Sequence, residues 1–189
     1  MHINPVEKTG LLLINPVKHG DSRGYLSETF RKEYIEKYFK TKLPEFCQEN
    51  KVHSKKGVLR GLHYQLPPYA QSKLITVLKG RVYDVVIDLR KWSGTFGRVF
   101  EFQLTDSKDS SLYIPRGFAH GFLTLSKESV LLYKLDNYYH PTSGASIAFD
   151  DIELDINWPI DPKSIIASRS DKTSKGFSEA PLFYDQSAI

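Results

Sequence analysis

Five polar residues lie in segments that are otherwise apolar, and together they could carry out proton-transfer chemistry. His63 stands in the segment GVLRGLHYQ, while Lys73, Asp84, His120 and Tyr133 occur in comparable segments. Histidine is a suitable base near neutral pH, a lysine can stabilise a developing enolate charge without a metal ion, and a tyrosine can supply a proton. Burying such groups is costly unless they have partners or line a wet cavity. Their recurrence among apolar residues therefore predicts a functional cavity.

Short apolar or alternating segments recur along the chain at strand spacing, with Gly, Pro, Asp and Ser between them. Only residues 31–40 have the period of a helix, because their apolar side chains fall on one stripe. Residues 161–170 are predicted to hold a second short helix or a turn. The predicted strands are residues 11–17, 25–30, 46–53, 58–65, 73–79, 82–89, 99–104, 111–114, 118–125, 130–135 and 147–149.

Many short strands with almost no helix predict an all-β sandwich or barrel rather than alternating strands and helices. A jelly-roll barrel closes such strands around an interior that can hold a ligand. No repeat, low-complexity run or linker divides the sequence, so a single domain over residues 1–189 is predicted. Pairing with a second subunit would relieve the open edge of such a sheet.

Period-2 alternation assigns side chains to the two faces of each predicted strand. It places Phe118, His120 and Phe122 on one face, and Phe46, Gln48 and Asn50 on one face of another strand.

Arg60 and His63 are three positions apart, so a regular strand would point them to opposite faces. Gly61 lies between them, and glycine within a strand often marks a bulge that re-aims a side chain. If both residues serve one site, irregular geometry is expected near Gly61.

Composition excludes several classes of protein. The net charge of +4 comes from scattered Lys and Arg, which predicts a solvated surface rather than a nucleic-acid interface. Cys47 is the only cysteine, which rules out an internal disulfide and indicates a reducing compartment. The segment MHINPVEKTG lacks the features of a signal peptide, and no apolar run approaches about 18 residues. The expectation is a soluble cytoplasmic protein that does not bind membranes.

The run GVLRGLHYQLPPYAQSKLITVLKGRVYDVVIDLR, followed by LYIPRGFAHGF, resembles the dTDP-4-dehydrorhamnose 3,5-epimerase family. The motifs DSRGYLSETF, FCQEN, LLYKLDNYYHP and NWP extend the resemblance over nearly the whole chain. It implies a homodimeric cupin-type jelly roll with one or two short helices and no cofactor. It also implies inversion of C3 and C5 of dTDP-4-dehydro-6-deoxy-D-glucose to give dTDP-4-dehydro-L-rhamnose. The reaction would abstract protons next to the 4-keto group and pass through an enolate.

The resemblance also implies roles for individual residues. His63 would be the general base, with Asp171 orienting it and raising its pKa. Lys73 would stabilise the enolate oxygen, and Tyr133 would deliver a proton to the opposite face of the sugar. Residues 23–28 would reach the partner subunit's site. Arg23 and Arg60 suit a diphosphate, because a guanidinium group can contact two phosphate oxygens. The residues implied in binding the sugar nucleotide are Arg23, Glu28, Gln48, Asn50, Arg60 and His120.

The chain departs from the family pattern at two positions. Gly144 stands where many members carry Glu, and Ser170 precedes Asp171 where members often carry Lys or Arg. An epimerase that inverts only C3 or only C5 of a related 4-keto sugar nucleotide is therefore an alternative.

Two further alternatives belong to other classes. A metal-dependent cupin usually presents a His-x-His pair, but here the segment reads His63-Tyr64-Gln65, so a metal site is not predicted. A sugar-binding cupin without catalysis would not need a base and an acid on opposing sides. Tyr25, Tyr138 and Tyr139 are candidates for stacking on a nucleobase.

Overall fold

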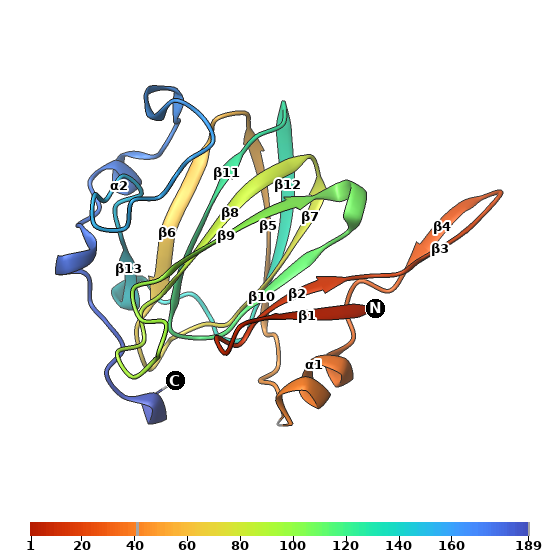
Figure 1. The fold of residues 1–189 in the computed structure, drawn as a ribbon, viewed down its shortest axis with the longest axis horizontal. Coiled ribbons are helices and arrows are strands. Elements are labelled where there is room, and N and C mark those ends of the chain that lie inside the picture. Colours follow the sequence, from red (N-terminus) through yellow and green to blue (C-terminus); the bar gives the residue numbers. More distant parts are fainter. Residues whose placement is uncertain (41, 189) are drawn as a thin grey trace.

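Two antiparallel β-sheets face each other in the computed structural model, which describes residues 1–40 and 42–188 (Figure 1). The six-stranded sheet has the order β1 (His2–Val6), β2 (Leu11–Asn15), β10 (Ser111–Ile114), β7 (Lys73–Lys79), β12 (Glu128–Leu135) and β5 (Gln48–Lys55). The five-stranded sheet has the order β13 (Gly144–Ser146), β6 (Leu59–Gln65), β11 (Phe118–Thr124), β8 (Arg81–Asp88) and β9 (Val99–Thr105). The predicted all-β jelly roll is confirmed.

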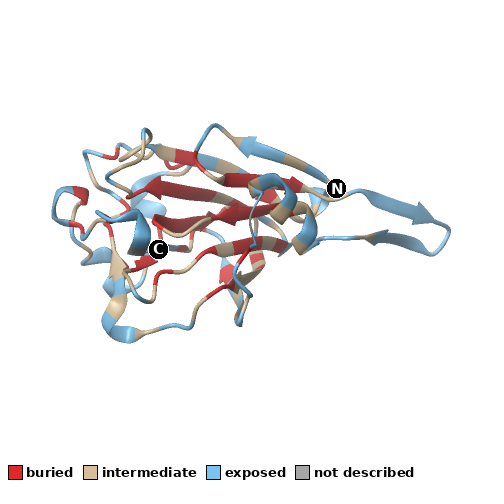
Figure 2. Cartoon of the chain, turned by 90° about the horizontal axis from the view of Figure 1, so that it is seen from below, coloured by how far each residue is buried: buried red, intermediate tan, exposed pale blue. Residues whose placement is uncertain are grey.

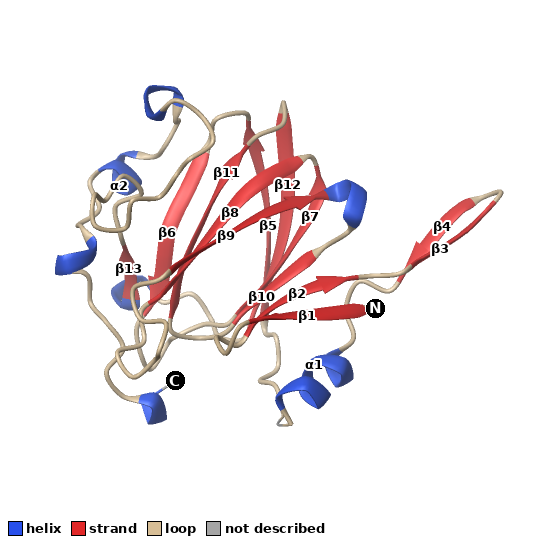
Figure 3. Ribbon diagram, in the orientation of Figure 1, coloured by secondary structure: helices blue, strands red, loops and turns tan. Residues whose placement is uncertain are grey.

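Helices occupy only the edges of the molecule (Figure 3). The helix predicted at residues 31–40 is α1 (Lys32–Phe39), and residues 161–170 contain a short 3-10 turn and the start of α2 (Arg169–Lys172). No helix among the described residues is long and apolar enough to cross a membrane. The 3-10 turns are Asp106–Lys108, Pro141–Ser143, Pro162–Ser164, Phe177–Glu179 and Gln186–Ala188.

A hairpin of β3 (Lys18–Asp21) and β4 (Gly24–Ser27) projects from the body of the molecule (Figure 1). Figure 2 shows that it is exposed along its length, whereas the strands of the body are largely buried. Leu26 at its second strand is 75% exposed. Within the described part of its own chain, the base of the hairpin is tied to the body by Lys18, which bonds to Ser107 and Asp109, but its apolar side chains Tyr25 and Leu26 stay exposed.

The structure differs from the predicted strands at three points. Strands β1 and β3 were not predicted, because their sequences HINPV and KHGD lack an apolar alternation. The last strand is Gly144–Ser146 rather than residues 147–149, and Ile147 makes only an isolated bridge to Lys175. Phe46 does not share the face of Gln48, because it precedes β5 and packs edge-on against Phe30.

Apolar side chains form three layers of core. The layer between the sheets contains Phe118 and Phe122 on the face predicted for them. Ala119 and Leu123 point the other way, into a layer between the five-stranded sheet and the C-terminal segment. A third layer lies between α1 and the outer face of the six-stranded sheet, where Ile35 is fully buried.

The predicted irregularity near Gly61 is a β-bulge between β6 and β11. His63 pairs with His120 and Arg60 pairs with Phe122, so two residues of β6 stand opposite Gly121 alone. Gly61 has a φ of +136°, which favours glycine. The extra residue brings Arg60 and His63 to the same face of the sheet.

Replacing Gly61 with alanine should destabilise the fold. A Cβ there would lie 2.5 Å from the Cα of Gly121, and the backbone at both positions is fixed by strand pairing. We expect the free energy of unfolding in urea to fall by about 2 kcal/mol or more. Gly94→Ala is the matched control, because a Cβ at Gly94 meets nothing within 4 Å; its effect should stay within about 0.5 kcal/mol. Equal effects of the two substitutions would contradict the structural role of Gly61.

Candidate active site

A cavity of about 730 Å³ lies between the two sheets. Strands of both sheets contribute to its wall, and the loop that leads into α2 closes one side. Eight of the ten residues predicted to form a site line this cavity: Gln48, Asn50, Arg60, His63, Lys73, His120, Tyr133 and Asp171.

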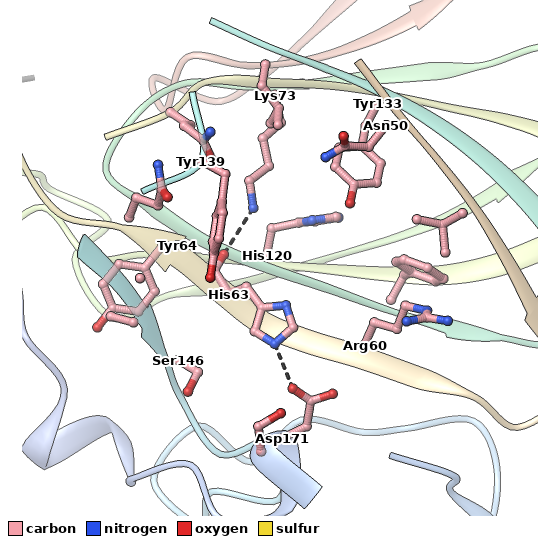
Figure 4. Close-up of a pocket in the computed structure, with 18 of the residues that line it drawn as sticks. Asn50, Arg60, His63, Tyr64, Lys73, His120, Tyr133, Tyr139, Ser146 and Asp171 are labelled. Atoms are coloured by element: carbon pink, nitrogen blue, oxygen red, sulfur yellow. Dashed lines mark hydrogen bonds and ion pairs between the residues drawn. The ribbon is translucent and has the colours of Figure 1, made fainter. Parts of the chain in front are cut away.

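His63 and Asp171 form a hydrogen-bonded pair at the wall of the cavity (Figure 4). The distance from His63 Nε2 to Asp171 Oδ1 is 2.7 Å, and the residues lie 108 positions apart. The Asp171 side chain is only 5% exposed, whereas that of His63 is 49% exposed. Because Nε2 is engaged by the carboxylate, Nδ1 is the ring nitrogen that can accept a proton from a ligand.

The pKa of His63 lies below the ordinary histidine value. Burial is the largest cause, because it disfavours the charged imidazolium. The hydrogen bond to Asp171 raises the pKa, as the sequence predicts, but by less than burial lowers it. The positive Lys73 and the nearby His120 lower it further. The predicted raising effect of Asp171 is therefore present, but burial outweighs it, and His63 is neutral at pH 7.

Lys73 reaches into the cavity from β7. Its ammonium group donates a hydrogen bond to the backbone oxygen of His63, with an Nζ–O distance of 3.1 Å. Burial lowers the pKa of Lys73 to about 8, and the negative charge of Asp84 opposes that shift. The ammonium is thus cationic at pH 7 and lies close to the base.

Asp84, one of the five polar residues singled out in the sequence but given no role there, is a buried carboxylate. Its Oδ2 lies 2.9 Å from His120 Nε2, and Asp84 is fully buried. Its Oδ1 has no hydrogen-bond partner among the described residues. Asp84 alternates with Val82 and Val86 along β8 and so shares their inner face. Asp84 orients His120 and supplies a negative charge near Lys73.

Tyr133 approaches the cavity from the opposite sheet. It lies on β12 of the six-stranded sheet, whereas His63 lies on β6 of the five-stranded sheet. Figure 4 shows its hydroxyl pointing into the cavity, on the other side from the His63 imidazole. Its neighbour across the β12–β5 pair is Asn50, which accepts a hydrogen bond from Gln48 at 3.2 Å. A molecule between the sheets would have one of these two groups on each side.

The mouth of the cavity is shaped by the loop that follows β12. The Gln48 side chain accepts a hydrogen bond from the backbone N–H of Tyr139 at 2.9 Å, and Gln65 accepts one from His140 at 2.7 Å. Both Tyr138 and Tyr139 are largely exposed, but only Tyr139 lines the cavity. The two glutamines therefore fix a loop that presents an aromatic ring to the cavity.

Two predicted site residues lie away from the cavity of their own chain. Arg23 is in the projecting hairpin and donates from Nε to Asp21 Oδ1 at 3.1 Å. Glu28 follows the hairpin and accepts from Arg31 Nε at 2.9 Å. Neither residue contributes to the cavity wall formed by the described part of this chain.

The cavity wall beside the His63–Asp171 pair is made of small residues, which the sequence did not predict to lie together. Gly144, Ser146, Ser168 and Ser170 all line the cavity there. The segment Ser168-Arg169-Ser170-Asp171 has the spacing of a helix-capping motif, which is the signal that could have identified Ser168. Among the described residues, no group of three His, Cys, Asp or Glu side chains could hold a metal ion.

Comparison with known proteins gives consistent matches over the chain. Residues 6–179 match the family described as dTDP-4-dehydrorhamnose 3,5-epimerase. A protein of that name from Shigella flexneri is 39% identical over 183 residues, which cover 97% of this chain and 99% of the relative.

Two solved structures show the same fold. The epimerase from Legionella pneumophila in complex with dTDP-4-keto-L-rhamnose has a TM-score of 0.90 and 37% identity, with 98% of each chain covered. A 3'-monoepimerase from Streptomyces bikiniensis in complex with dTDP-quinovose has a TM-score of 0.84 and 32% identity, with 94% of this chain and 88% of that chain covered.

Proposed function

This chain belongs to the dTDP-4-dehydrorhamnose 3,5-epimerase family, and we propose that it inverts C3 and C5 of dTDP-4-dehydro-6-deoxy-D-glucose to give dTDP-4-dehydro-L-rhamnose. The observation that carries this proposal is the position of His63 and Tyr133 on opposite sheets across one cavity. Inversion at carbon requires that a proton leave from one face and another arrive at the opposite face. A base and an acid on facing sheets meet that requirement.

Each inversion follows the same sequence of proton transfers. Nδ1 of neutral His63 removes the proton from the carbon next to the 4-keto group. The electron pair of the C–H bond forms the carbon–carbon double bond of the enolate, and the π pair of the carbonyl moves to its oxygen. The Lys73 ammonium stabilises the resulting enolate oxygen. The Tyr133 hydroxyl then protonates the carbon from the other face. Solvent removes the proton from His63 and returns one to Tyr133, so the enzyme is regenerated.

The protonation states support these roles at neutral pH. A lowered pKa keeps His63 in the neutral form that can accept a proton. A pKa of about 8 keeps most Lys73 side chains cationic at pH 7. Asp171 holds the proton of the free histidine on Nε2, because a carboxylate accepts a hydrogen bond there.

The remaining predicted residues would bind the nucleotide and the sugar. Arg60 lies at the cavity wall and suits the diphosphate, because a guanidinium contacts two phosphate oxygens at once. Tyr139 at the mouth suits the nucleobase, and His120, held by Asp84, suits a sugar hydroxyl. The Legionella relative binds a dTDP-linked keto sugar, which supports dTDP as the nucleotide.

A homodimer that exchanges residues 23–28 would complete the site. The hairpin carries Arg23, projects from the body and exposes Tyr25 and Leu26 by 59% and 75%. Exposed apolar side chains on a projecting arm indicate a partner surface. In the dimer, Arg23 and Glu28 would reach the partner's cavity and add a second arginine for the diphosphate.

Inversion at C3 alone or C5 alone stays the alternative. The Streptomyces bikiniensis 3'-monoepimerase has a closely similar fold, so the fold does not separate the two activities. Gly144 and Ser170, which depart from the family pattern, both line the cavity. A single domain over residues 1–189, a cytoplasmic location and the absence of a cofactor also stay predictions.

Turnover of the substrate in deuterated water tests the double inversion. Because each inversion delivers a solvent-derived proton, the product should carry deuterium at both C3 and C5, as read by NMR and mass spectrometry. His63→Asn is the control and should incorporate none. Deuterium at a single carbon of the product would replace the proposal with the C3-only or C5-only reading.

Mixing two inactive variants tests the exchange of residues 23–28. Arg23→Ala and His63→Ala each damage a different part of the site. In a mixed dimer, one site receives intact residues from both subunits, so co-refolding equal amounts should restore about a quarter of the wild-type activity. A mixture no more active than the separate variants would show that Arg23 serves no partner site.

A further inference from the structure

The residue that orients the base lies on an unusually short helix. Asp171 belongs to α2 (Arg169–Lys172), which has four residues. One turn of helix is not stable by itself, because nucleation fixes several backbone angles for a single hydrogen bond. The Asp171 carboxylate must nevertheless stay 2.7 Å from His63 Nε2. Contacts outside the helical hydrogen bonds must therefore hold this turn.

Ser168 provides the first of these contacts. It is the N-cap of α2, and its Oγ accepts a hydrogen bond from the backbone N–H of Asp171 at 3.1 Å. The same Oγ lies 2.8 Å from Ser170 Oγ. The cap therefore acts on the backbone of the residue whose side chain orients the base.

A second contact ties the end of the turn to the strand beside His63. The Ser174 hydroxyl donates to Ser146 Oγ at 2.8 Å and lies 3.1 Å from the backbone oxygen of Ser170. Ser146 is the residue of β13 that pairs with His63 of β6. A continuous chain of contacts thus runs from His63 through the β6–β13 pair, the Ser146–Ser174 bond and α2 to Asp171, which bonds back to His63. Within this chain of contacts, the Ser168 cap sets the position of Asp171.

We propose that Ser168 is a positioning residue of the reaction, and that its hydroxyl acts through Asp171 to hold the carboxylate on Nε2 of His63. The kinetic part of this inference rests on the proposed function. Ser168 also lines the cavity, so a direct contact with substrate is the role that the test must separate from positioning.

Loss of the cap has a predictable sign at His63. The groups that act on its pKa are Asp171, which raises it, and Lys73 and His120, which lower it. If Asp171 is held less firmly, its raising effect weakens and the pKa of His63 falls further. The acid limb of the pH profile of kcat/KM then moves to lower pH. A substrate contact would instead raise KM and leave the acid limb in place.

The test compares Ser168→Ala with Ser168→Thr, which keeps a capping hydroxyl. NMR titration of the His63 ring in the free enzyme should show a lower pKa for Ser168→Ala and a restored pKa for Ser168→Thr. We expect kcat to fall about five- to tenfold in Ser168→Ala with KM changed less than about twofold. Ser168→Gly removes the hydroxyl but tolerates the capping conformation, so it gives the same readout if the alanine variant does not fold.

Two controls separate positioning from general loosening of the turn. Thr173→Ala removes a hydroxyl that bonds to the backbone oxygens of Arg169 and Ser170 and not to Asp171, so the pKa of His63 should not change. In an Asp171→Asn background, Ser168→Ala should have no additional effect.

The inference would be overturned if the pKa of His63 were unchanged in both Ser168→Ala and Ser168→Gly. It would also be overturned if Ser168→Ala had the same effect in the Asp171→Asn background as in the wild-type protein. If Ser168→Ala lowers the pKa of His63 but the unmodified protein does not epimerise the proposed substrate, the proposed function is refuted. The positioning role of Ser168 then still stands.

Discussion

One extra residue in β6 determines which side chains can meet in the cavity. Opposite Gly121, the strand carries Gly61 and Leu62, so Arg60 and His63 face inward although they are three positions apart. The same offset sends Leu59 and Leu62 outward, where both are buried under the C-terminal segment. Glycine is required on both strands, because a Cβ at Gly121 would lie 2.8 Å from Leu62 and 2.9 Å from the Arg60 oxygen. The bulge therefore determines both which leucines of β6 pack in the core and which polar side chains of β6 face the cavity.

Burial between two apolar sheets then sets the chemistry of the groups that the bulge brings together. Desolvation disfavours charge on both His63 and Lys73, which gives a neutral base and a cation whose pKa of about 8 lies close to neutral pH. Asp171 limits the shift of His63 through its hydrogen bond and its charge, and the charge of Asp84 limits the shift of Lys73. A weakly solvated ammonium stabilises an enolate oxygen more than an exposed one would, since the local dielectric constant is low.

The sequence predicted most of the body of the fold and the inner face of the site. Short apolar or alternating segments predicted strands at residues 73–79 and 111–114 with their observed bounds. Period-2 alternation put His120 on the same face as Phe118 and Phe122, and the structure makes that face the inner one. The irregularity at Gly61 was predicted on the condition that Arg60 and His63 serve one site, because two residues three positions apart share a face of a strand only if an extra residue lies between them.

Other features could not be read from local patterns. β13 consists of Gly, Ala and Ser and is a strand only because β6 pairs with it. Asp171 and His63 are hydrogen-bonded although they lie 108 positions apart in the sequence, and only the family resemblance predicted that they meet. The sign of the His63 pKa shift depends on the balance of burial against one hydrogen bond, which requires the packed structure. The position of Arg23 depends on a hairpin that projects away from the body of its own chain.

We infer that the base and the acid act from opposite sheets in separable steps. Incubation of Tyr133→Phe with the substrate in deuterated water tests it most directly, with NMR following both exchange and configuration. We expect His63 still to remove and return protons on its own face, so that deuterium enters the substrate with retention of configuration and inverted product does not form. Inversion at a rate close to that of the wild-type enzyme would contradict the assignment of Tyr133 as the acid and the two-sided mechanism with it.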